Sequence, residues 1–487
     1  MAETTIKNWP PWIVRPSATL LLLSDRARVS LGRRPRWQGL LLLSLAALLV
    51  RIWAARVSIG SNDIVTWEGF AQEVLDHGVS RTYLLDGEFN HPPLMGYLAA
   101  ASMQVAKGLG LPFAFVFKLT PIVASVLTIY MLGRAYRLPR SILLLLVVSP
   151  IDILISSYHG NTDTLCVAFC VAALLAANGG RFILSGLALG AAINVKLIPV
   201  IAIVPMLASL PSWKARVRFS FSLVVCALPF VPILLSVFHA FVQNAILYNS
   251  FRAYWGFGML AYGTEASFPR ASQALWHFTE LGKYPILAGS AAYALLPFVG
   301  RRIERAQYCA FAFATFLVFA SGFGPQYLVY PAPFLVVVRP RLGSAYALVS
   351  GVFALFLYHW YWTNTYPLFS EFRSRPPDTS ALMVGFGSWC LLAYYWLASL
   401  GQQTAALREH LLRQYSKAKA DRMLALTGFI GVDLDTLEAA RRRLAQHEAM
   451  LDSAASSSRA VLPAPRAGPN ELEALAAQGP PRSHIGH

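Results

Sequence analysis

Long apolar segments separated by short basic clusters recur through most of this chain, and they constrain its fold more than any other feature. Hydrophobic residues make up 56% of the sequence and charged residues 13%, whereas a soluble domain carries about a quarter charged residues. This pattern predicts an all-α polytopic membrane protein with about twelve transmembrane helices. We expect these helices near residues 38–56, 113–133, 141–157, 162–178, 182–198, 199–211, 217–238, 284–300, 306–321, 326–338, 343–362 and 380–400.

The distribution of lysine and arginine orients these helices. In residues 57–91, the first long outer loop, Arg81 stands against six carboxylates. Because positively charged loops stay in the cytoplasm, we expect both termini there and an even number of spans. The net charge of +17 then reflects topology and need not indicate nucleic acid. The expected inner loops contain Arg134, Arg137, Arg140, Arg181, Lys214, Arg216, Arg218, Arg301, Arg302, Arg305, Arg339 and Arg341.

The predicted organisation has three parts. Residues 1–37 form a basic cytoplasmic N-terminus, and the following apolar run has no small-residue cleavage site, which favours an uncleaved first span over a signal peptide. Residues 38–400 form the transmembrane domain. Residues 401–487 form a cytoplasmic tail, in which 404–424 and 433–453 have helical spacing and the part beyond about 455 is expected to be disordered. Two outer regions are expected to be functional: residues 57–110, with interfacial helices that include 92–110, and residues 239–283.

Signatures of cofactors and metals are missing from the sequence. All five cysteines lie inside apolar runs, so we expect free, buried thiols without a disulfide framework or a zinc site. The sequence contains no Walker-type loop, no Rossmann glycine motif and no metal-spaced histidine pair. This argues against nucleotide-sugar chemistry, and we expect no cofactor and no metal.

Asp63 is the candidate catalytic residue. Ser61 or Asn62 can cap a helix in which Asp63 occupies the first turn, where the helix dipole favours a carboxylate. An ionised carboxylate at the membrane surface could accept the proton of an attacking sugar hydroxyl. The alternative is that Asp63 is itself only a helix cap. The apolar stripe of this predicted helix contains Ile64, Trp67, Phe70 and Val74.

Histidines occur at two further points that are expected on the same outer side of the membrane as Asp63. His91 precedes two prolines that stiffen the chain, and it could donate to a lipid phosphate or simply bond to backbone at the interface. The short turn Tyr158–Asp163 brings His159 and Asp163 to that side. The geometry of a turn alone could explain its glycine and asparagine, and Asp163 could simply cap the next helix. We nevertheless expect the side chains of His159 and Asp163 to bind a phosphate or a sugar.

Three other segments offer groups for a phosphate or a sugar. Lys196 lies in an apolar run, where charged residues are functional by default; it could hold a phosphate or form a structural pair with Asp152. Arg252 lies among aromatic residues of the second outer loop and could bind phosphate or snorkel at the interface. Gln326 and Tyr327, in a glycine-rich outer turn, could bond to a sugar, although the turn could also simply break a helix.

The order of these features resembles the GT-C superfamily of polyprenyl-phosphate-sugar-dependent glycosyltransferases. Asn90–Tyr97 (Asn-His-Pro-Pro-Leu-Met-Gly-Tyr) looks like the Asp-Tyr-Pro-Pro-Leu-Thr-x-Tyr segment of dolichyl-phosphate-glucose glucosyltransferases, and Tyr158–Asn161 looks like their Asp-His/Tyr-Gly-His turn. Gly160-x-x-Asp163 is similar to the Gly-Gln-x-Asp of bacterial polyprenyl-phosphate-mannose mannosyltransferases. The resemblance covers roughly residues 38–400. Gly324-Pro325-Gln326 stands where the eukaryotic enzymes carry His-Glu-Lys, and the first loop has no Asp-x-Asp.

The resemblance implies an inverting transfer of a hexose, mannose or glucose, from a polyprenyl-phosphate donor to a lipid-linked or glycolipid acceptor. Asp63 would be the base, and Lys196, Arg252 or His91 would stabilise the leaving phosphate. The short loops and the tail rich in alanine and arginine favour a bacterial inner membrane, with the site facing outward. A transporter or flippase of lipid-linked sugars is the alternative, although no repeated halves are evident. A partner protein could bind the cytoplasmic tail in either case.

Overall fold

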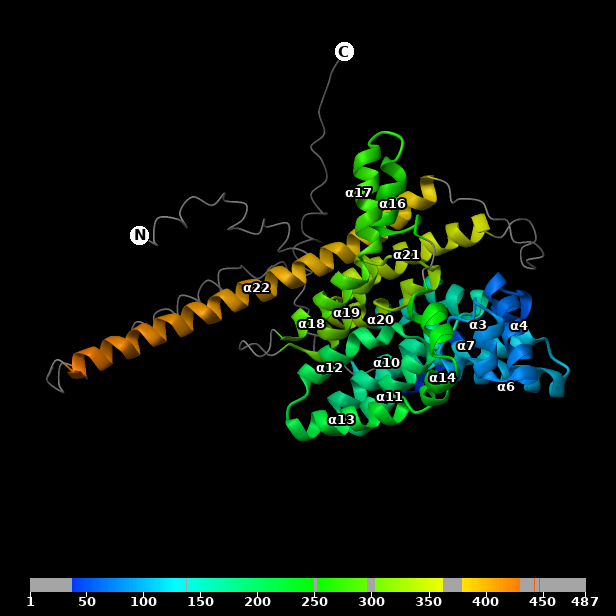
Figure 1. The fold of residues 1–487 in the computed structure, drawn as a ribbon, viewed down its shortest axis with the longest axis horizontal. Coiled ribbons are helices and arrows are strands. Elements are labelled where there is room, and N and C mark those ends of the chain that lie inside the picture. The colour runs from blue at the N-terminus through cyan, green and yellow to red at the C-terminus, as the bar shows by residue number, and fades with distance from the viewer. Residues whose placement is uncertain are drawn as a thin grey trace, which may run out of the picture. The chain divides into compact units, whose positions relative to one another are not determined.

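The computed structural model describes residues 37–136, 138–248, 252–295, 303–361 and 379–429, together with Arg442 and Gln446. The chain divides into two units, Met1–Leu407 and Arg408–His487. The described part of the first unit is all-helical and contains every residue discussed below (Figure 1). Described residues of the second unit belong mainly to the end of α22 (Thr379–Phe429), which covers the predicted helix 404–424. The predicted N-terminal region up to residue 36 and the predicted helix 433–453, apart from Arg442 and Gln446, lie outside the described residues.

Within the described ranges, five segments are long and apolar enough to cross a membrane. They contain α3 (Trp37–Val57), α7 (Phe113–Ala135), α21 (Pro340–Tyr361), the first half of α22, and the segment Arg140–His159. That last segment joins α8 (Arg140–Val147), α9 (Pro150–Ile153) and a π-helix over Leu154–His159. A sixth span results if α13 (Trp213–Cys226) and α14 (Phe230–Ser236), bent by 56° at their junction, count as one. An integral membrane protein follows from these helices.

The expectation of about twelve full spans is therefore not confirmed. Helices occupy the other expected segments, but they are short or broken. Proline accounts for some of the breaks, since it removes a helical hydrogen bond: Pro199 opens a 3-10 segment between two helices, and Pro229 lies at the bend before α14. These helices are α10 (Asp163–Asn178), α11 (Phe182–Val195), α12 (Ile203–Ser209), α18 (Lys283–Leu295), α19 (Arg305–Val318) and α20 (Ala332–Val338).

The first outer loop folds into helices that pack together. Asn62–His77 forms α4, Val79–Leu85 forms α5 and Pro93–Leu109 forms α6, and α4 packs against α6. The predicted stripe of α4 is buried: Ile64 and Phe70 are 1% and 2% exposed. Burial of this stripe fixes the rotation of α4 about its axis and therefore the direction of the residues in its first turn.

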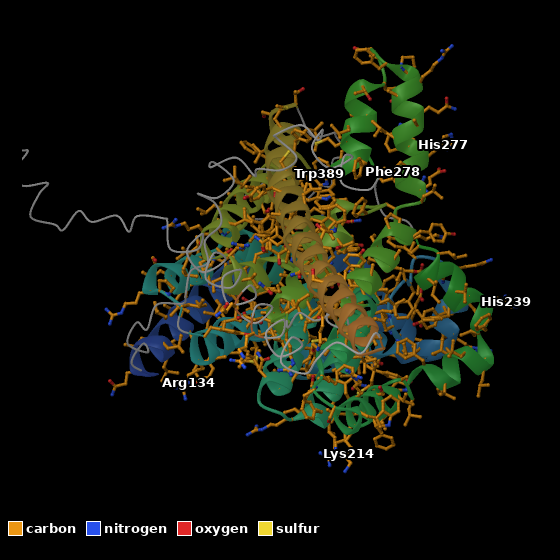
Figure 2. All side chains as sticks on the ribbon, turned by 90° about the vertical axis from the view of Figure 1, so that its left-hand side faces the viewer. Arg134, Lys214, His239, His277, Phe278 and Trp389 are labelled. Carbon is orange, nitrogen blue, oxygen red and sulfur yellow. The ribbon has the colours of Figure 1, made fainter. Side chains whose placement is uncertain are left out.

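The second outer region is also helical. It contains the short α15 (Phe238–Phe241), a π-helix over Val242–Ile246, and a hairpin of α16 (Gly256–Thr264) and α17 (Pro269–Glu280). Figure 2 shows His277 and Phe278 of α17 toward one end of the helical body, and Arg134 and Lys214 toward the opposite end. These two pairs of labelled residues thus lie at opposite ends in this view, while His239 of the same outer region lies between them.

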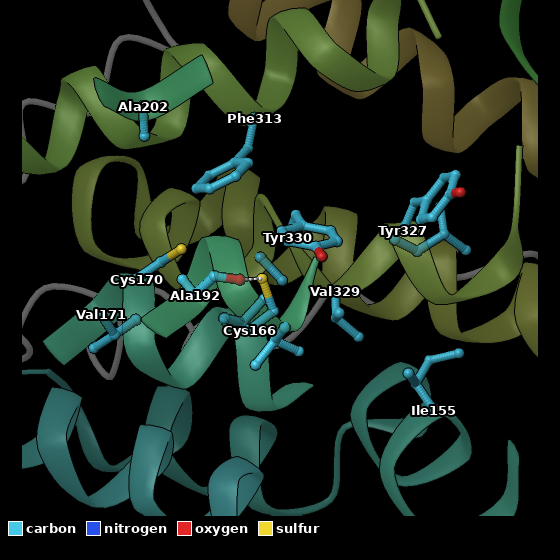
Figure 3. Packing of buried hydrophobic residues seen from close by; sticks show 14 of the residues in the cluster. Ile155, Cys166, Cys170, Val171, Ala192, Ala202, Phe313, Tyr327, Val329 and Tyr330 are labelled. Carbon is cyan, nitrogen blue, oxygen red and sulfur yellow. Dashed lines mark hydrogen bonds between the residues drawn. The ribbon is translucent and has the colours of Figure 1, made fainter. Parts of the chain in front are cut away.

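The centre of the first unit is closely packed around α10. Cys166 donates a hydrogen bond to the carbonyl oxygen of Ala192, 3.3 Å away, and the Tyr330 ring packs against Phe313 in a tilted arrangement with ring centroids 5.3 Å apart (Figure 3). All five cysteines are free; Cys166, Cys170 and Cys309 are buried as expected, whereas Cys226 is half-buried and Cys390 is exposed. Helix α10 packs against both α11 and α19.

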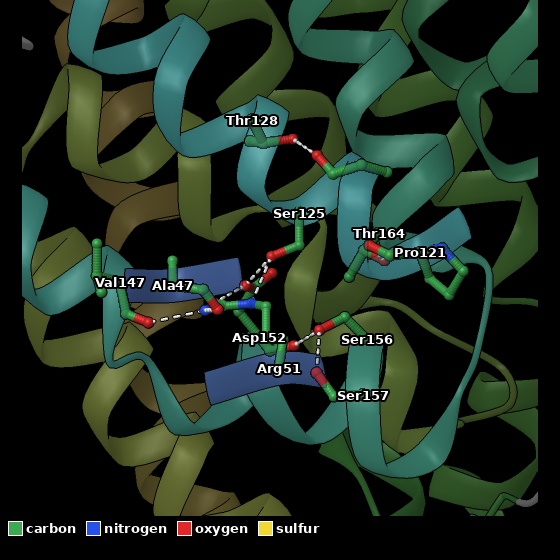
Figure 4. A network of polar contacts seen from close by, with 11 residues as sticks. Ala47, Arg51, Pro121, Ser125, Thr128, Val147, Asp152, Ser156, Ser157 and Thr164 are labelled. Atoms are coloured by element: carbon green, nitrogen blue, oxygen red, sulfur yellow. Dashed lines mark hydrogen bonds and ion pairs between the residues drawn. The ribbon is translucent and has the colours of Figure 1, made fainter. Parts of the chain in front are cut away.

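A buried arginine of α3 connects that helix with α7, α8 and α9. Arg51 of α3 is fully buried; it donates to the carboxylate of Asp152, to Ser125 and to the carbonyl oxygens of Ala47 and Val147 (Figure 4). Ser125 also donates to Asp152. This corrects one alternative from the sequence, because Asp152 pairs with Arg51 and not with Lys196. Apolar surroundings force such a charge to find a partner.

Candidate active site

A cavity of about 640 Å³ lies where the first outer loop meets several later segments. The start of α4 and His91 line one part of it. Other lining residues come from His159 and Asn161, from Lys196–Ile198, from the second outer region (Ala245, Tyr248 and Tyr254) and from Ser321–Tyr327. Of the eight residues singled out in the sequence, six line this cavity: they are Asp63, His91, His159, Lys196, Gln326 and Tyr327.

Asp63 reaches across to the 158–163 turn. The helix cap is Ser61, whose side chain does not cap α4 but donates to the carbonyl oxygen of His159, 3.3 Å away. Asp63 Oδ2 lies 2.8 Å from His159 Nε2 and accepts a hydrogen bond from Asn161 Nδ2 at 3.0 Å. The Asp63 side chain is 40% exposed, so it faces the cavity while being held from behind.

The surroundings of Asp63 keep it ionised. Burial acts to raise the pKa of its carboxyl, but His159, followed by Lys196 and Asn161, outweighs that effect and lowers the pKa to about 2. The carboxylate is consequently present throughout the neutral pH range, in the form that can accept a proton.

Backbone geometry explains how His159 is presented. A π-helix over Leu154–His159 ends at Gly160, which has a φ of +74°. A Cβ atom there would lie 2.6 Å from Ile64 Cδ1 and 2.8 Å from Lys118 Cγ, so this close approach of the turn to α4 requires glycine. π-helical turns are frequent at functional sites, and here the turn aims the His159 ring at Asp63.

Lys196 supplies the positive charge of the cavity. The α11 helix ends at Val195, and Lys196 adopts an extended conformation with φ −157° and ψ 146°. Its Nζ lies 2.8 Å from Asp163 Oδ2 and 4.8 Å from the centre of the Tyr327 ring. Asp163 is fully buried and does not itself line the cavity. Among the described residues that line the cavity, Lys196 is the one lysine or arginine.

His91 enters the cavity as a neutral ring. Its ring packs against Trp67 in a tilted arrangement, with ring centroids 4.4 Å apart and planes inclined by 43°, and Tyr83 donates to its carbonyl oxygen. Burial lowers the pKa of His91 to about 3. His91 can therefore offer an N–H to a ligand, but it does not bring a positive charge.

Arg252 lies elsewhere. It is not among the residues lining the cavity, and its guanidinium donates to Glu280 Oε1 at 3.0 Å. Arg252 therefore lies outside the cavity that contains Asp63 and Lys196, with its guanidinium paired to a carboxylate of α17, and its contact with a donor phosphate stays a prediction.

Sequence reasoning missed three residues around Asp63. Asn161 was part of a recognised turn but was not assigned a role. Tyr358, whose hydroxyl lies 2.5 Å from His159 Nδ1, is hidden in an apolar span. Lys118 is fully buried on α7 and donates to the Ser58 carbonyl oxygen at 2.9 Å; a charge inside an apolar run was the signal that could have found it.

The arrangement can accept a proton at one point and stabilise negative charge at another. Asp63 provides the proton acceptor, and Lys196 with the N–H of His91 provides the groups for an anion. In the described ranges, histidine, cysteine, aspartate and glutamate do not form a group of three or more that could hold a metal ion.

Comparison with known proteins gives one similarity. Residues 89–322 match the model of glycosyltransferase family 87, a segment that includes His91, His159, Asp163 and Lys196 but begins after Asp63. No curated protein matches the chain. The similarity to glycosyltransferase family 87, together with the apolar helices, indicates a membrane glycosyltransferase.

Proposed function

We propose that the protein transfers a hexose from a polyprenyl-phosphate donor to a lipid-linked or glycolipid acceptor, with inversion at the anomeric carbon. The observation that carries this proposal is the presence, in one cavity, of an ionised Asp63 and the ammonium of Lys196. A base and a cation in the same cavity are what such a displacement needs, since a proton is lost at one point and negative charge develops at another.

The reaction balances as a single displacement. The acceptor hydroxyl oxygen forms a bond to the anomeric carbon, and its proton passes to Asp63. The bond between the anomeric carbon and the phosphate oxygen breaks, and its electron pair leaves with the polyprenyl phosphate. Attack from the side opposite the phosphate inverts the configuration. Asp63 returns its proton to water after the product leaves, because its side chain is open to the cavity.

Lys196 is the proposed partner of the leaving phosphate. An ammonium has three N–H donors, and Asp163 takes one of them. The buried Asp163 therefore orients the ammonium of Lys196, and the two other N–H groups can bind the phosphate. The neutral N–H of His91 is proposed to assist it. Gln326 and Tyr327, on the wall beside Lys196, are proposed to contact the sugar or the phosphate.

The proposed site faces the extracytoplasmic side of a bacterial inner membrane, with both termini in the cytoplasm. Arg134 and Lys214 lie at one end of the helical body and the α16–α17 hairpin at the other, which supports this orientation. The proposed substrates are lipids, and the cytoplasmic tail is proposed to be available to a protein partner.

The experiment that tests the function compares Asp63→Asn with Asp76→Asn. Asp76 lies on the same helix, is exposed and accepts hydrogen bonds from Gln72, so it is a matched control. Purified variants are given a labelled polyprenyl-phosphate hexose and membrane lipid extract. We expect Asp63→Asn to reduce formation of labelled glycolipid by about 10³-fold, within the range for a lost general base, and Asp76→Asn to act as wild type. Near-normal transfer by Asp63→Asn, or movement of labelled donor across vesicles without a new glycosidic bond, would overturn the proposal.

A further inference from the structure

A second side chain holds His159 from the side opposite Asp63. Tyr358 lies in α21, 199 residues away in sequence, and its hydroxyl is 2.5 Å from His159 Nδ1. Both side chains are buried, with Tyr358 3% and His159 4% exposed. The imidazole thus has a hydrogen-bond partner at each nitrogen: the phenol of Tyr358 in the interior and the carboxylate of Asp63 at the cavity.

The protonation of the ring at Nε2 follows from these partners. An ionised carboxylate can only accept hydrogen bonds, so His159 Nε2 must carry a proton toward Asp63. A phenol hydroxyl can donate or accept, so Tyr358 satisfies Nδ1 whether His159 is neutral or charged. The orientation of the ring is therefore the same in both charge states.

The hydrogen bonds at Asp63 distinguish its two oxygens. His159 and Asn161 both bond to Oδ2. An oxygen that accepts two hydrogen bonds is less basic than its partner, which makes Oδ1 the better acceptor for a new proton. A rotation of the His159 ring would release Oδ2 and let the carboxylate turn, so the position of Oδ1 depends on Tyr358.

Passage of the substrate proton through His159 to Tyr358 is disfavoured by the surroundings. Tyr358 is buried on α21 beside Tyr158, with ring centroids 5.6 Å apart, whereas Asp63 is open to the cavity. A proton on Asp63 can reach water directly. The contact between Tyr358 and His159 therefore serves geometry.

We propose that Tyr358 is a positioning residue for Asp63. It holds the ring of His159, and His159 together with Asn161 holds Oδ2 of Asp63, so that Oδ1 points at the hydroxyl of the acceptor substrate. This rests on the proposed function, in which Asp63 is the base. A positioning role predicts an effect on the rate of the chemical step and little effect on donor binding, because the phosphate-binding groups lie on Lys196 and His91, away from Tyr358.

The first test compares Tyr358→Phe with Tyr346→Phe. Tyr346 is on the same helix, is fully buried, and donates to the Leu328 carbonyl oxygen at 2.9 Å, so both variants delete one buried hydroxyl. We expect Tyr358→Phe to reduce kcat by roughly 10- to 100-fold with an unchanged KM for the donor, and Tyr346→Phe to leave kcat unchanged, with thermal unfolding measured for both.

The second test changes His159, first with Tyr358 unchanged and then together with Tyr358→Phe. Glutamine at 159 can place an N–H near the position of Nε2, and asparagine places it nearer Nδ1. We expect His159→Gln to retain more activity than His159→Asn, and adding Tyr358→Phe to His159→Gln to have no further effect on kcat.

The outcomes separate the two proposals. The positioning role would be overturned if the wild type transfers the hexose and Tyr358→Phe and Tyr346→Phe have equal kcat. Equal activity of His159→Gln and His159→Asn would overturn it as well. In both cases the proposed function would stand. A wild-type protein that forms no glycosidic bond from any polyprenyl-phosphate hexose would overturn both.

Discussion

The ammonium of Lys196 lies 2.8 Å from a carboxylate oxygen of Asp163, and the two partners have different environments. Asp163 is fully buried, while the Lys196 side chain is 12% exposed at the cavity. A buried carboxylate that pairs with a cavity-lining cation fixes the cation from behind. The pair therefore contributes in two ways that can be measured separately: it stabilises the fold, and it places a positive charge at the cavity.

Lys196→Met should lose both properties. Removing one partner of a buried pair destabilises a protein by about 3–5 kcal/mol, and removing a group that stabilises developing charge lowers kcat by about 10²–10³-fold. Thermal unfolding in detergent and transfer kinetics measure the two effects on the same sample.

The double variant Lys196→Met/Asp163→Asn separates them. It removes the unpaired buried charge, so we expect thermal stability to recover while transfer stays low. Recovery of transfer together with stability would make Lys196 a structural residue only.

The pH dependence of transfer should report the environment of Asp63. A base works only when it is ionised, so activity falls as the pH drops through its pKa, which lies at about 2 in the wild type. His159→Gln removes the largest group that lowers this pKa, while burial, which raises it, remains. We expect the ratio of variant to wild-type kcat/KM to decrease as the pH falls from about 8 to about 4. A ratio that is constant over this range would contradict the environment described for Asp63.

Local patterns in the sequence predicted the parts of the site that depend on a single helix. The spacing of Ile64, Trp67, Phe70 and Val74 predicted the buried face of α4, because the helical period places them together. Nothing in that spacing identifies His159, which is 96 residues from Asp63. Their expected location on the same side of the membrane limited the candidates, but the contact itself depends on the packing of α4 against the 158–163 turn.

Partner choice and helix length could not be predicted from composition. The sequence suggested Asp152 as a partner of Lys196, whereas in the structure Asp152 pairs with Arg51 and Asp163 pairs with Lys196. Hydropathy located the apolar segments, but proline at positions such as 199 and 229 interrupts the helices within them. Nothing in the sequence marked Tyr358 as a site residue, because a single tyrosine in an apolar span is common. Only the fold shows that its hydroxyl lies beside His159.

His91 should contribute a neutral hydrogen bond to donor binding. Its pKa of about 3 keeps the ring uncharged at neutral pH, and its ring packs against Trp67. His91→Phe retains an aromatic ring against Trp67 and deletes the N–H, so we expect the KM for the donor to increase by about tenfold, the equivalent of one hydrogen bond, with little change in kcat. His91→Gln should restore part of the loss. An unchanged KM in His91→Phe would remove His91 from the donor site.

Arg51 should contribute to stability and not to the chemistry of the cavity. It is fully buried, bonds to Asp152, Ser125 and two carbonyl oxygens, and does not line the cavity. Arg51→Met leaves Asp152 without its cation, so we expect a loss of about 3–5 kcal/mol in the free energy of unfolding. Arg51→Met/Asp152→Asn should recover part of that loss, because it no longer leaves an unpaired charge. The folded fraction of either variant should keep the wild-type kcat and donor KM, measured below its unfolding temperature. A large fall in kcat at full folding would show that the network around Arg51 controls the site, through the π-helical turn that follows Asp152 and ends at His159.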